Sequence, residues 1–190
     1  MNTKSILLVG VGGQGTILAA KILSIGLMEA GYDVKMSEIH GMSQRGGAVS
    51  SHVRYGDKVH SPVVELGGAD VLVSFEQMEA LRNLEYLKPG AKVVVNSQII
   101  KPTPVLIGKA TYSDKILDEL ASKADVTVVD ATNEAMKVGN PRSANILLAG
   151  SVIKIMKLEH IDWDKIIADN VKAAFVEVNQ KALRRGMELV

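Results

Sequence analysis

The sequence predicts an α/β fold in which helices cover both faces of a Rossmann-like, mostly parallel sheet. Short runs rich in Val and Ile alternate with helical patterns along the chain, as is typical of parallel strands joined by helices. A glycine-rich turn follows the first of these runs and opens the first helical pattern. The chain has 190 residues, of which 47% are hydrophobic and 23% charged, which is enough for one full-sized core. We therefore expect residues 1–190 to form a single domain.

The pattern of apolar residues predicts the first elements. A buried strand is expected at residues 5–10 and a helix at residues 16–30, where few positions are polar, as in a helix that packs against a sheet. Gly31 is of the residue type that commonly ends a helix. A second strand is expected at residues 34–37. The glycine-rich turn thus lies between a strand and a helix.

An inserted hairpin is expected after the second strand. Residues 48–55 alternate between the two faces of a strand, and Gly56-Asp57 supplies a two-residue turn. The expected return strand, residues 58–61, is short and ends at Pro62, which is typical of an edge strand.

The next part of the chain continues the alternation of strands and helices. Pro89-Gly90 indicates a turn, and the two prolines of residues 101–104 indicate a rigid, extended connection. The expected elements are a strand at 69–75, a helix at 76–87, a strand at 91–96, a helix at 113–123 and a strand at 126–130.

Two helices are predicted in the C-terminal part of the chain. Residues 143–157 are apolar around nearly the whole circumference, so this helix must be buried on all sides. Either the chain itself or a second copy must cover it, and a homo-oligomer is therefore one expectation. The last helix is expected at residues 169–185, with Gly186 ending it.

The turn at residues 10–15 is the first candidate binding site. It satisfies the pattern G-x-G-x-x-G, and the backbone N–H groups at the start of the following helix favour an anion such as a phosphate. Glu38, the first acidic residue at the end of the next strand, comes later than the acidic residue of dinucleotide-binding folds. The alternative is that the glycines only form a tight connection. The candidate residues are Gly10, Gly12, Gly13, Gln14 and Gly15.

A second candidate is the loop that follows the second strand. Because ligands of open α/β sheets bind at the carboxyl ends of the strands, we expect this loop and the glycine turn to face one crevice. Arg45 offers a planar set of donors for phosphate or carboxylate, and His40 is a weaker candidate for proton transfer. The alternative is a surface loop in which Arg45 pairs with Glu38. The candidate binding residues here are Ser43, Gln44, Arg45 and Gly46.

A third candidate precedes the apolar helix. Asn140 and Pro141 suit the start of a helix, and capping alone explains Asn140. Arg142 and Asn145 remain, with Asn140, candidates for contact with a ligand or a subunit.

Composition excludes several classes of function. The 22 Lys and Arg balance the 21 Asp and Glu, so no strong field directs the chain to nucleic acid or to an anionic membrane. Without a signal peptide or a transmembrane stretch, a cytoplasmic location is expected. The absence of cysteine excludes disulfides, thiolate nucleophiles and iron–sulfur ligation, and the spacing of the four histidines predicts no metal site.

Several motifs together identify a family. These are Gly10-Val-Gly-Gly-Gln-Gly15, the run Ser37-Glu-Ile-His-Gly-Met-Ser-Gln-Arg-Gly-Gly47, Ser51-His-Val-Arg-Tyr-Gly56 and Gly139-Asn-Pro-Arg142. Over nearly its full length the chain resembles the beta subunits of indolepyruvate ferredoxin oxidoreductases. Looser forms of the first two motifs belong to the related gamma subunits of other 2-oxoacid:ferredoxin oxidoreductases.

The resemblance implies a role in the oxidative decarboxylation of aryl pyruvates to aryl-acetyl coenzyme A, with electrons passed to ferredoxin. It implies that thiamine diphosphate, magnesium and the iron–sulfur clusters are held by a larger alpha subunit, and that this chain is inactive alone. The glycine turn and the Arg45 loop would then line one wall of the shared site and help to position coenzyme A or the oxoacid.

Three alternatives remain open from the sequence. The chain could be the gamma subunit of an enzyme for 2-oxoglutarate, pyruvate or branched-chain oxoacids. A stand-alone NAD(P)-binding oxidoreductase would use the glycine turn, but the late position of Glu38 argues against it. A nucleotide-sensing regulatory domain would catalyse nothing in any assembly.

Overall fold

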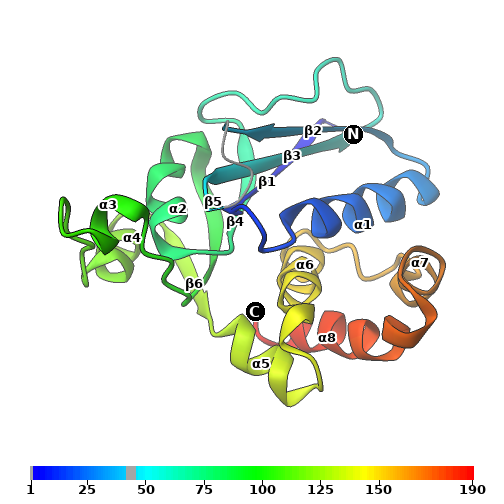
Figure 1. Ribbon diagram of the computed structural model, residues 1–190. Coiled ribbons are helices and arrows are strands. Elements are labelled where there is room, and N and C mark those ends of the chain that lie inside the picture. The colour runs from blue at the N-terminus through cyan, green and yellow to red at the C-terminus, as the bar shows by residue number, and fades with distance from the viewer. Residues whose placement is uncertain (1, 42–45) are drawn as a thin grey trace.

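The computed structural model describes residues 2–41 and 46–190 and contains a six-stranded sheet with helices on both faces (Figure 1). The strands are β1 (Lys4–Val11), β2 (Asp33–His40), β3 (Ala48–Gly56), β4 (Ala69–Ser74), β5 (Leu87–Asn96) and β6 (Asp125–Val129). The α-helices are α1 (Thr16–Glu29), α2 (Gln77–Arg82), α3 (Thr103–Leu106), α4 (Ile116–Lys123), α5 (Ala131–Lys137), α6 (Ala144–Ile155), α7 (Trp163–Asn170) and α8 (Val176–Glu188). The short 3-10 turns are η1 (Leu84–Tyr86), η2 (Pro141–Ser143) and η3 (Ala173–Phe175).

The sheet is mostly parallel, which confirms the predicted fold class. Its order is β2-β3-β1-β4-β5-β6, and β1, β4, β5 and β6 run parallel to one another. β3 lies between β1 and β2 and is antiparallel to both. β2 therefore runs in the same direction as β1, and the two strands end at the same edge of the sheet.

Alternate residues of the central strands enter two separate cores. Ile6 and Leu8 of β1 pack with α1 and α6, whereas Leu7 and Val9 pack on the opposite face with α2 and α4. In Figure 1, α1, α5, α6, α7 and α8 lie on one side of the sheet and α2, α3 and α4 on the other. Both faces of β1 are buried, which explains why its sequence is an apolar run rather than an alternation.

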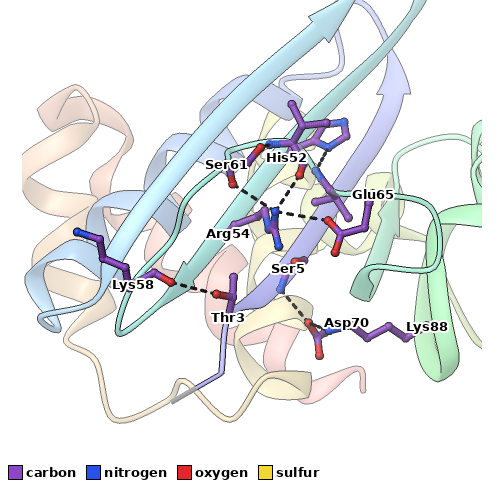
Figure 2. A network of polar contacts seen from close by, with 11 residues as sticks. Thr3, Ser5, His52, Arg54, Lys58, Ser61, Glu65, Asp70 and Lys88 are labelled. Carbon is purple, nitrogen blue, oxygen red and sulfur yellow. Dashed lines mark hydrogen bonds and ion pairs between the residues drawn. The ribbon is translucent and has the colours of Figure 1, made fainter.

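The predicted hairpin is wrong in its pairing. The structure pairs β3 with β2, and residues 58–61 form no strand. Since β1 and β2 occupy both edges of β3, no edge is left for a return strand. The chain instead crosses the face of the sheet, where Arg54 donates hydrogen bonds to the carbonyl oxygens of Ser61 and Val63, and His52 accepts one from Val64 (Figure 2).

The structure differs from the prediction at three places between residues 76 and 106. The extended connection at 101–104 is interrupted by α3, because Pro104 lies in its first turn, where a missing N–H costs nothing. Pro89 and Gly90 lie within β5, in a stretch where the pairing with β4 shifts register. The helix predicted at 76–87 ends at Arg82 and is followed by η1.

The C-terminal part is the least well predicted. In place of one helix at 169–185, α7 and α8 are separated by η3. Gly186 does not end a helix; it lies inside α8, where a Cβ atom would come 1.8 Å from the carbonyl oxygen of Leu147. The chain's own α1 and α8 cover α6, and residues 145–153 are all buried. The apolar helix is therefore covered without a second chain.

None of the helices in the described part of the chain has the length and apolar character needed to cross a membrane.

Candidate functional site

The two glycine-containing bends lie side by side at the carboxyl edge of the sheet, as predicted. The N–H of Gly12 donates to the carbonyl oxygen of Gly47 at 2.9 Å, and the N–H of Gly46 donates to Gly12 at 3.4 Å. The reason is the sheet order, since Val49 of β3 pairs with Gly10 on one side and with His40 on the other. Ser43, Gln44 and Arg45 lie outside the described residues, so their predicted binding roles remain predictions.

Gln14 is the side chain that holds the glycine turn. Its Oε1 accepts a hydrogen bond from the N–H of Val11 at 2.7 Å, and its Nε2 donates to the carbonyl of Phe75 at 2.8 Å and to Oε1 of Gln98 at 2.9 Å. A Cβ atom on Gly10 would lie 2.8 Å from Gln14 Oε1, so Gly10 leaves the space that this amide fills. Gln14 thus ties the turn to β4 and to the chain after β5.

The third candidate patch joins the same turn. Nδ2 of Asn145, at the start of α6, donates to the carbonyl oxygen of Gly15 at 3.2 Å. Gly15 has a left-handed φ of 82°, and a Cβ atom there would come 2.5 Å from Asn145 Nδ2. Gly13 is also left-handed, with φ 105°. Gly13 and Gly15 therefore meet the backbone requirement of the turn, and the packing of Asn145 against Gly15 connects α6 to it.

A cavity of about 380 Å³ lies between the turn, the start of α1 and the β2–β3 hairpin. Glu38 and His40 of β2 line it together with Thr16 and Ile17 of α1. The ring of His40 contacts the carbonyl oxygen of Gly41, 3.2 Å from Nδ1. Among the described residues it has no acidic or nucleophilic partner, so a role in proton transfer remains a prediction.

A second cavity of about 380 Å³ lies on the other side of the glycine turn. Four neutral amides line it: Gln14, Asn96, Gln98 and Asn145. Asn96 Nδ2 donates to the carbonyl of Phe75 at 3.2 Å, and its Oδ1 accepts from the N–H of Ala131 at 3.0 Å. Neither Asn96 nor Gln98 is among the predicted site residues, although Asn96 ends a predicted strand and Gln98 follows it closely, where ligands of open α/β sheets bind.

Asn140 and Arg142 have different roles. Asn140 Oδ1 accepts from the N–H of Arg142 at 3.0 Å, so Asn140 caps η2, the alternative that its sequence position allowed. The exposed Arg142 side chain lines the second cavity and also a third, of about 410 Å³, between η2 and the segment joining α7 to α8.

Buried acidic side chains lie beside Gly46, in the loop that joins β2 to β3. Gly46, Glu76 and Glu79 line a small cavity of about 40 Å³. Glu76 accepts hydrogen bonds from the Tyr112 hydroxyl and from the N–H of Ile100. Burial raises the pKa of Glu79, although the nearby Arg82 guanidinium acts against this shift; burial and the hydrogen bond to Glu76 raise the pKa of the Tyr112 hydroxyl. These contacts fix the start of α2 and the chain after β5 next to the candidate site.

Comparison with known proteins gives consistent matches over nearly the whole chain. The family model described as pyruvate ferredoxin/flavodoxin oxidoreductase matches residues 5–189. Indolepyruvate oxidoreductase subunit IorB of Pyrococcus horikoshii is 38% identical over 196 aligned positions, which cover 99% of this chain and 96% of that protein. The pyruvate/ketoisovalerate oxidoreductases common subunit gamma of Thermococcus litoralis is 28% identical, over 94% of this chain and 92% of the relative.

A solved structure has the same fold. The gamma subunit of a keto/oxoacid ferredoxin oxidoreductase from Geobacter sulfurreducens superimposes with a TM-score of 0.73 at 25% identity, over 98% of this chain and 97% of the other.

Proposed function

The chain belongs to the pyruvate ferredoxin/flavodoxin oxidoreductase family, and we propose that it is the small subunit of an indolepyruvate ferredoxin oxidoreductase. Its higher identity to subunits named for the indolepyruvate enzyme than to the pyruvate/ketoisovalerate gamma subunit supports this choice over other 2-oxoacids. In this role the chain supports the conversion of aryl pyruvates to aryl-acetyl coenzyme A with reduction of ferredoxin.

The electron chemistry belongs, in this proposal, to a larger partner subunit. The chain contains no cysteine and thus no thiolate for an iron–sulfur cluster. Within residues 2–41 and 46–190, His, Asp and Glu form no group of three or more able to hold a metal ion. We therefore assign magnesium thiamine diphosphate and the iron–sulfur clusters to the partner and expect no turnover by this chain alone.

The contribution of this chain is to position an acidic small molecule, either coenzyme A or the oxoacid. The observation that carries this is the contact between Gly12 and residues 46–47, which brings the two glycine-containing bends to one edge of the sheet. Backbone N–H groups at the start of α1 and the side chains of the hairpin loop, Arg45 among them, would orient the ligand for reaction in the partner's site.

The sheet order argues against a stand-alone NAD(P)-dependent enzyme. In dinucleotide-binding folds, the strand after the first helix lies next to the first strand and carries the acidic residue that binds the ribose. Here β3 occupies that position, and Ser51 stands opposite Glu38 in the pairing. Glu38 is therefore one strand too far from the turn for that role.

The test is reconstitution with the larger, thiamine- and cluster-containing subunit that the proposal requires. The two polypeptides should co-purify, and the complex should reduce a dye with indolepyruvate only when coenzyme A is present. Each polypeptide alone should be inactive. Robust turnover by this chain alone, or failure to associate with a thiamine- and cluster-containing partner, would contradict the proposal.

A further inference from the structure

The segment between β5 and α4 presents apolar side chains to solvent. We call residues 99–112 the α3 loop, because α3 lies at its centre. Leu106 exposes 70% of its surface and Ile107 exposes 59%, and all four residues of α3 are exposed or half-buried. Leu106 is the most exposed large apolar side chain in the described part of the chain. In Figure 1, α3 lies at the outer left edge of the molecule.

Hydrogen bonds hold the α3 loop in shape although its side chains are exposed. One carboxylate fixes both of its ends, since Glu76 Oε1 accepts hydrogen bonds from the N–H of Ile100 and from the Tyr112 hydroxyl. Within the loop, the carbonyl oxygens of Pro102 and Pro104 each accept two backbone N–H groups, and both proline rings restrict φ. The loop is therefore preorganised, which lowers the conformational entropy that it loses on binding a partner.

The charge around these apolar side chains has a single sign. Lys101 and Lys109 are exposed, and neither forms an ion pair with a residue that the structure describes. Residues 97–113 contain no Asp or Glu, whereas the chain as a whole is nearly neutral, with 22 Lys and Arg against 21 Asp and Glu. A complementary surface therefore combines an apolar pocket with carboxylates at its rim.

A protein fits the α3 loop better than a membrane or a nucleic acid does. Lipid-binding segments typically carry about four to eight Lys or Arg or form an amphipathic helix of several turns, and α3 has only four residues. Nucleic acids require a larger basic surface than two lysines provide. Two adjacent apolar side chains with cations beside them match the apolar centre and polar rim of a protein–protein interface.

We propose that the α3 loop docks into an apolar pocket with an acidic rim on the larger subunit of the complex. Leu106 and Ile107 fill the pocket, and Lys101 and Lys109 pair with carboxylates around it. Because Glu76 fixes the loop to the start of α2, docking at this loop orients the whole chain on its partner. This inference deepens the proposed function and rests on it for the identity of the partner.

The experiment measures the affinity of the full chain for the larger, thiamine- and cluster-containing subunit by biolayer interferometry. We expect Leu106→Glu to weaken association about thirtyfold or more, because it removes an apolar contact and brings a carboxylate to an acidic rim. Met28→Glu is the matched control, since Met28 is an apolar side chain of α1 that exposes 52% of its surface. It should bind like wild type.

The charged rim is tested by the salt dependence of the same association. Wild-type affinity should fall as salt is added, because exposed charge pairs are screened. A chain carrying both Lys101→Glu and Lys109→Glu should bind more weakly and lose this dependence. Lys21→Glu, at an exposed position of α1, should keep the wild-type affinity and dependence. Equal salt dependence in wild type and the double variant would contradict the acidic rim.

Hydrogen exchange locates the contact independently. The backbone amides of residues 99–112 should exchange more slowly in the complex than in the free chain. Unchanged exchange there, equal affinity of wild type and Leu106→Glu, or an equal loss in Leu106→Glu and Met28→Glu would overturn the docking site while the active complex still forms. Circular dichroism of each variant confirms that it is folded.

Two further outcomes separate the alternatives. Sedimentation of wild type with phosphatidylserine vesicles that Leu106→Glu abolishes, with assembly unchanged, would assign the α3 loop to a membrane and overturn the proposal. A wild-type chain that binds no thiamine-containing subunit would remove the proposed function and this partner together. Failure of the docking site alone is thus distinct from failure of the function.

Discussion

The Gln14 side chain uses part of the space that the glycine motif leaves free. Its amide bonds to Val11, Phe75 and Gln98, so it occupies the space that Gly10 leaves open. The motif predicts a place where a pyrophosphate approaches closely. In the structure, part of the glycine pattern serves the chain's own packing, and the N–H of Gly12 is bonded to Gly47. The donors left for a ligand are those farther along the turn.

Arg45→Ala tests the predicted binding role of the loop between β2 and β3. We expect normal assembly with the larger subunit and a KM for coenzyme A or the oxoacid raised about tenfold or more, because a charge-assisted contact to the ligand is lost. Steady-state kinetics of the purified complex measure the effect. Arg184→Ala, with the same charge change on α8, is the control. Normal kinetics in a well-assembled Arg45→Ala complex would contradict the role.

His52 should make the fold less stable in mild acid. The ring is buried, its Nδ1 accepts the N–H of Val64 at 3.0 Å, and burial lowers its pKa (Figure 2). The folded state thus prefers the neutral ring. The corresponding stability is fully present above the unfolded pKa of about 6.5 and decreases as the pH falls from there through the lowered folded pKa.

Denaturant unfolding between pH 8 and pH 5.5 checks this prediction. The free energy of unfolding of wild type should fall below pH 6.5, and His52→Gln should be less stable at pH 8 but show a smaller fall. His60→Gln, at an exposed position, should follow the wild-type curve. Parallel curves for wild type and His52→Gln would show that His52 is not the responsible group.

At the scale of elements, local pattern and long-range pairing explain what could be predicted. The predicted strand at 5–10 and helix at 16–30 agree closely with β1 and α1, because burial fixes their apolar patterns locally. The return strand at 58–61 failed because strand pairing depends on which edges are free, and β1 and β2 occupy both edges of β3. Similarly, no local signal connects Asn145 with Gly15, which are 130 positions apart in the chain.

The crossing of α6 and α8 depends on two glycines. A Cβ atom at Gly150 would come 2.1 Å from the carbonyl oxygen of Leu183, and one at Gly186 would come 1.8 Å from that of Leu147. Helix propensity alone would make Gly→Ala stabilising by up to about 1 kcal/mol. Here the two backbones must move apart, so we expect Gly150→Ala and Gly186→Ala each to destabilise the chain by about 1–3 kcal/mol or more.

Thermal or denaturant unfolding of the two variants measures that effect. Gly41→Ala is the matched control, because a Cβ atom there meets nothing within 4 Å. Unchanged or raised stability in Gly150→Ala would mean that the helices do not cross as closely as the structure has them.

Across the whole molecule, the two ends of the sheet have different roles. The candidate site residues gather at the carboxyl edge, where the ends of β1, β2, β4 and β5 meet the start of α6. That edge could be predicted from the sequence because it follows from strand direction alone. The placement of Arg142 and Asn145 beside the glycine turn could not be predicted, since it depends on how α6 packs against α1.

The amino-terminal edge is held by Asp70. Its carboxylate accepts hydrogen bonds from Lys4 at 3.0 Å, Lys88 at 2.7 Å and the N–H of Ser5 at 2.8 Å, which joins the starts of β1, β4 and β5 (Figure 2). Burial by itself would raise the pKa of Asp70, but these hydrogen bonds outweigh it and lower the pKa. The resulting stability is present above the unfolded pKa of about 3.9 and is lost as the pH falls through the folded value.

Asp70→Asn should therefore separate stability from ligand binding. We expect a loss of about 1–2 kcal/mol in the free energy of unfolding at pH 7, a moderate value because both lysines are partly exposed. At pH 3 the difference from wild type should shrink, since the wild-type carboxylate is itself becoming protonated. The KM for coenzyme A of the reconstituted complex should not change, because Asp70 lies at the opposite edge of the sheet from the candidate site. A raised KM at a temperature where the variant remains folded would show that the two edges are coupled through the strands.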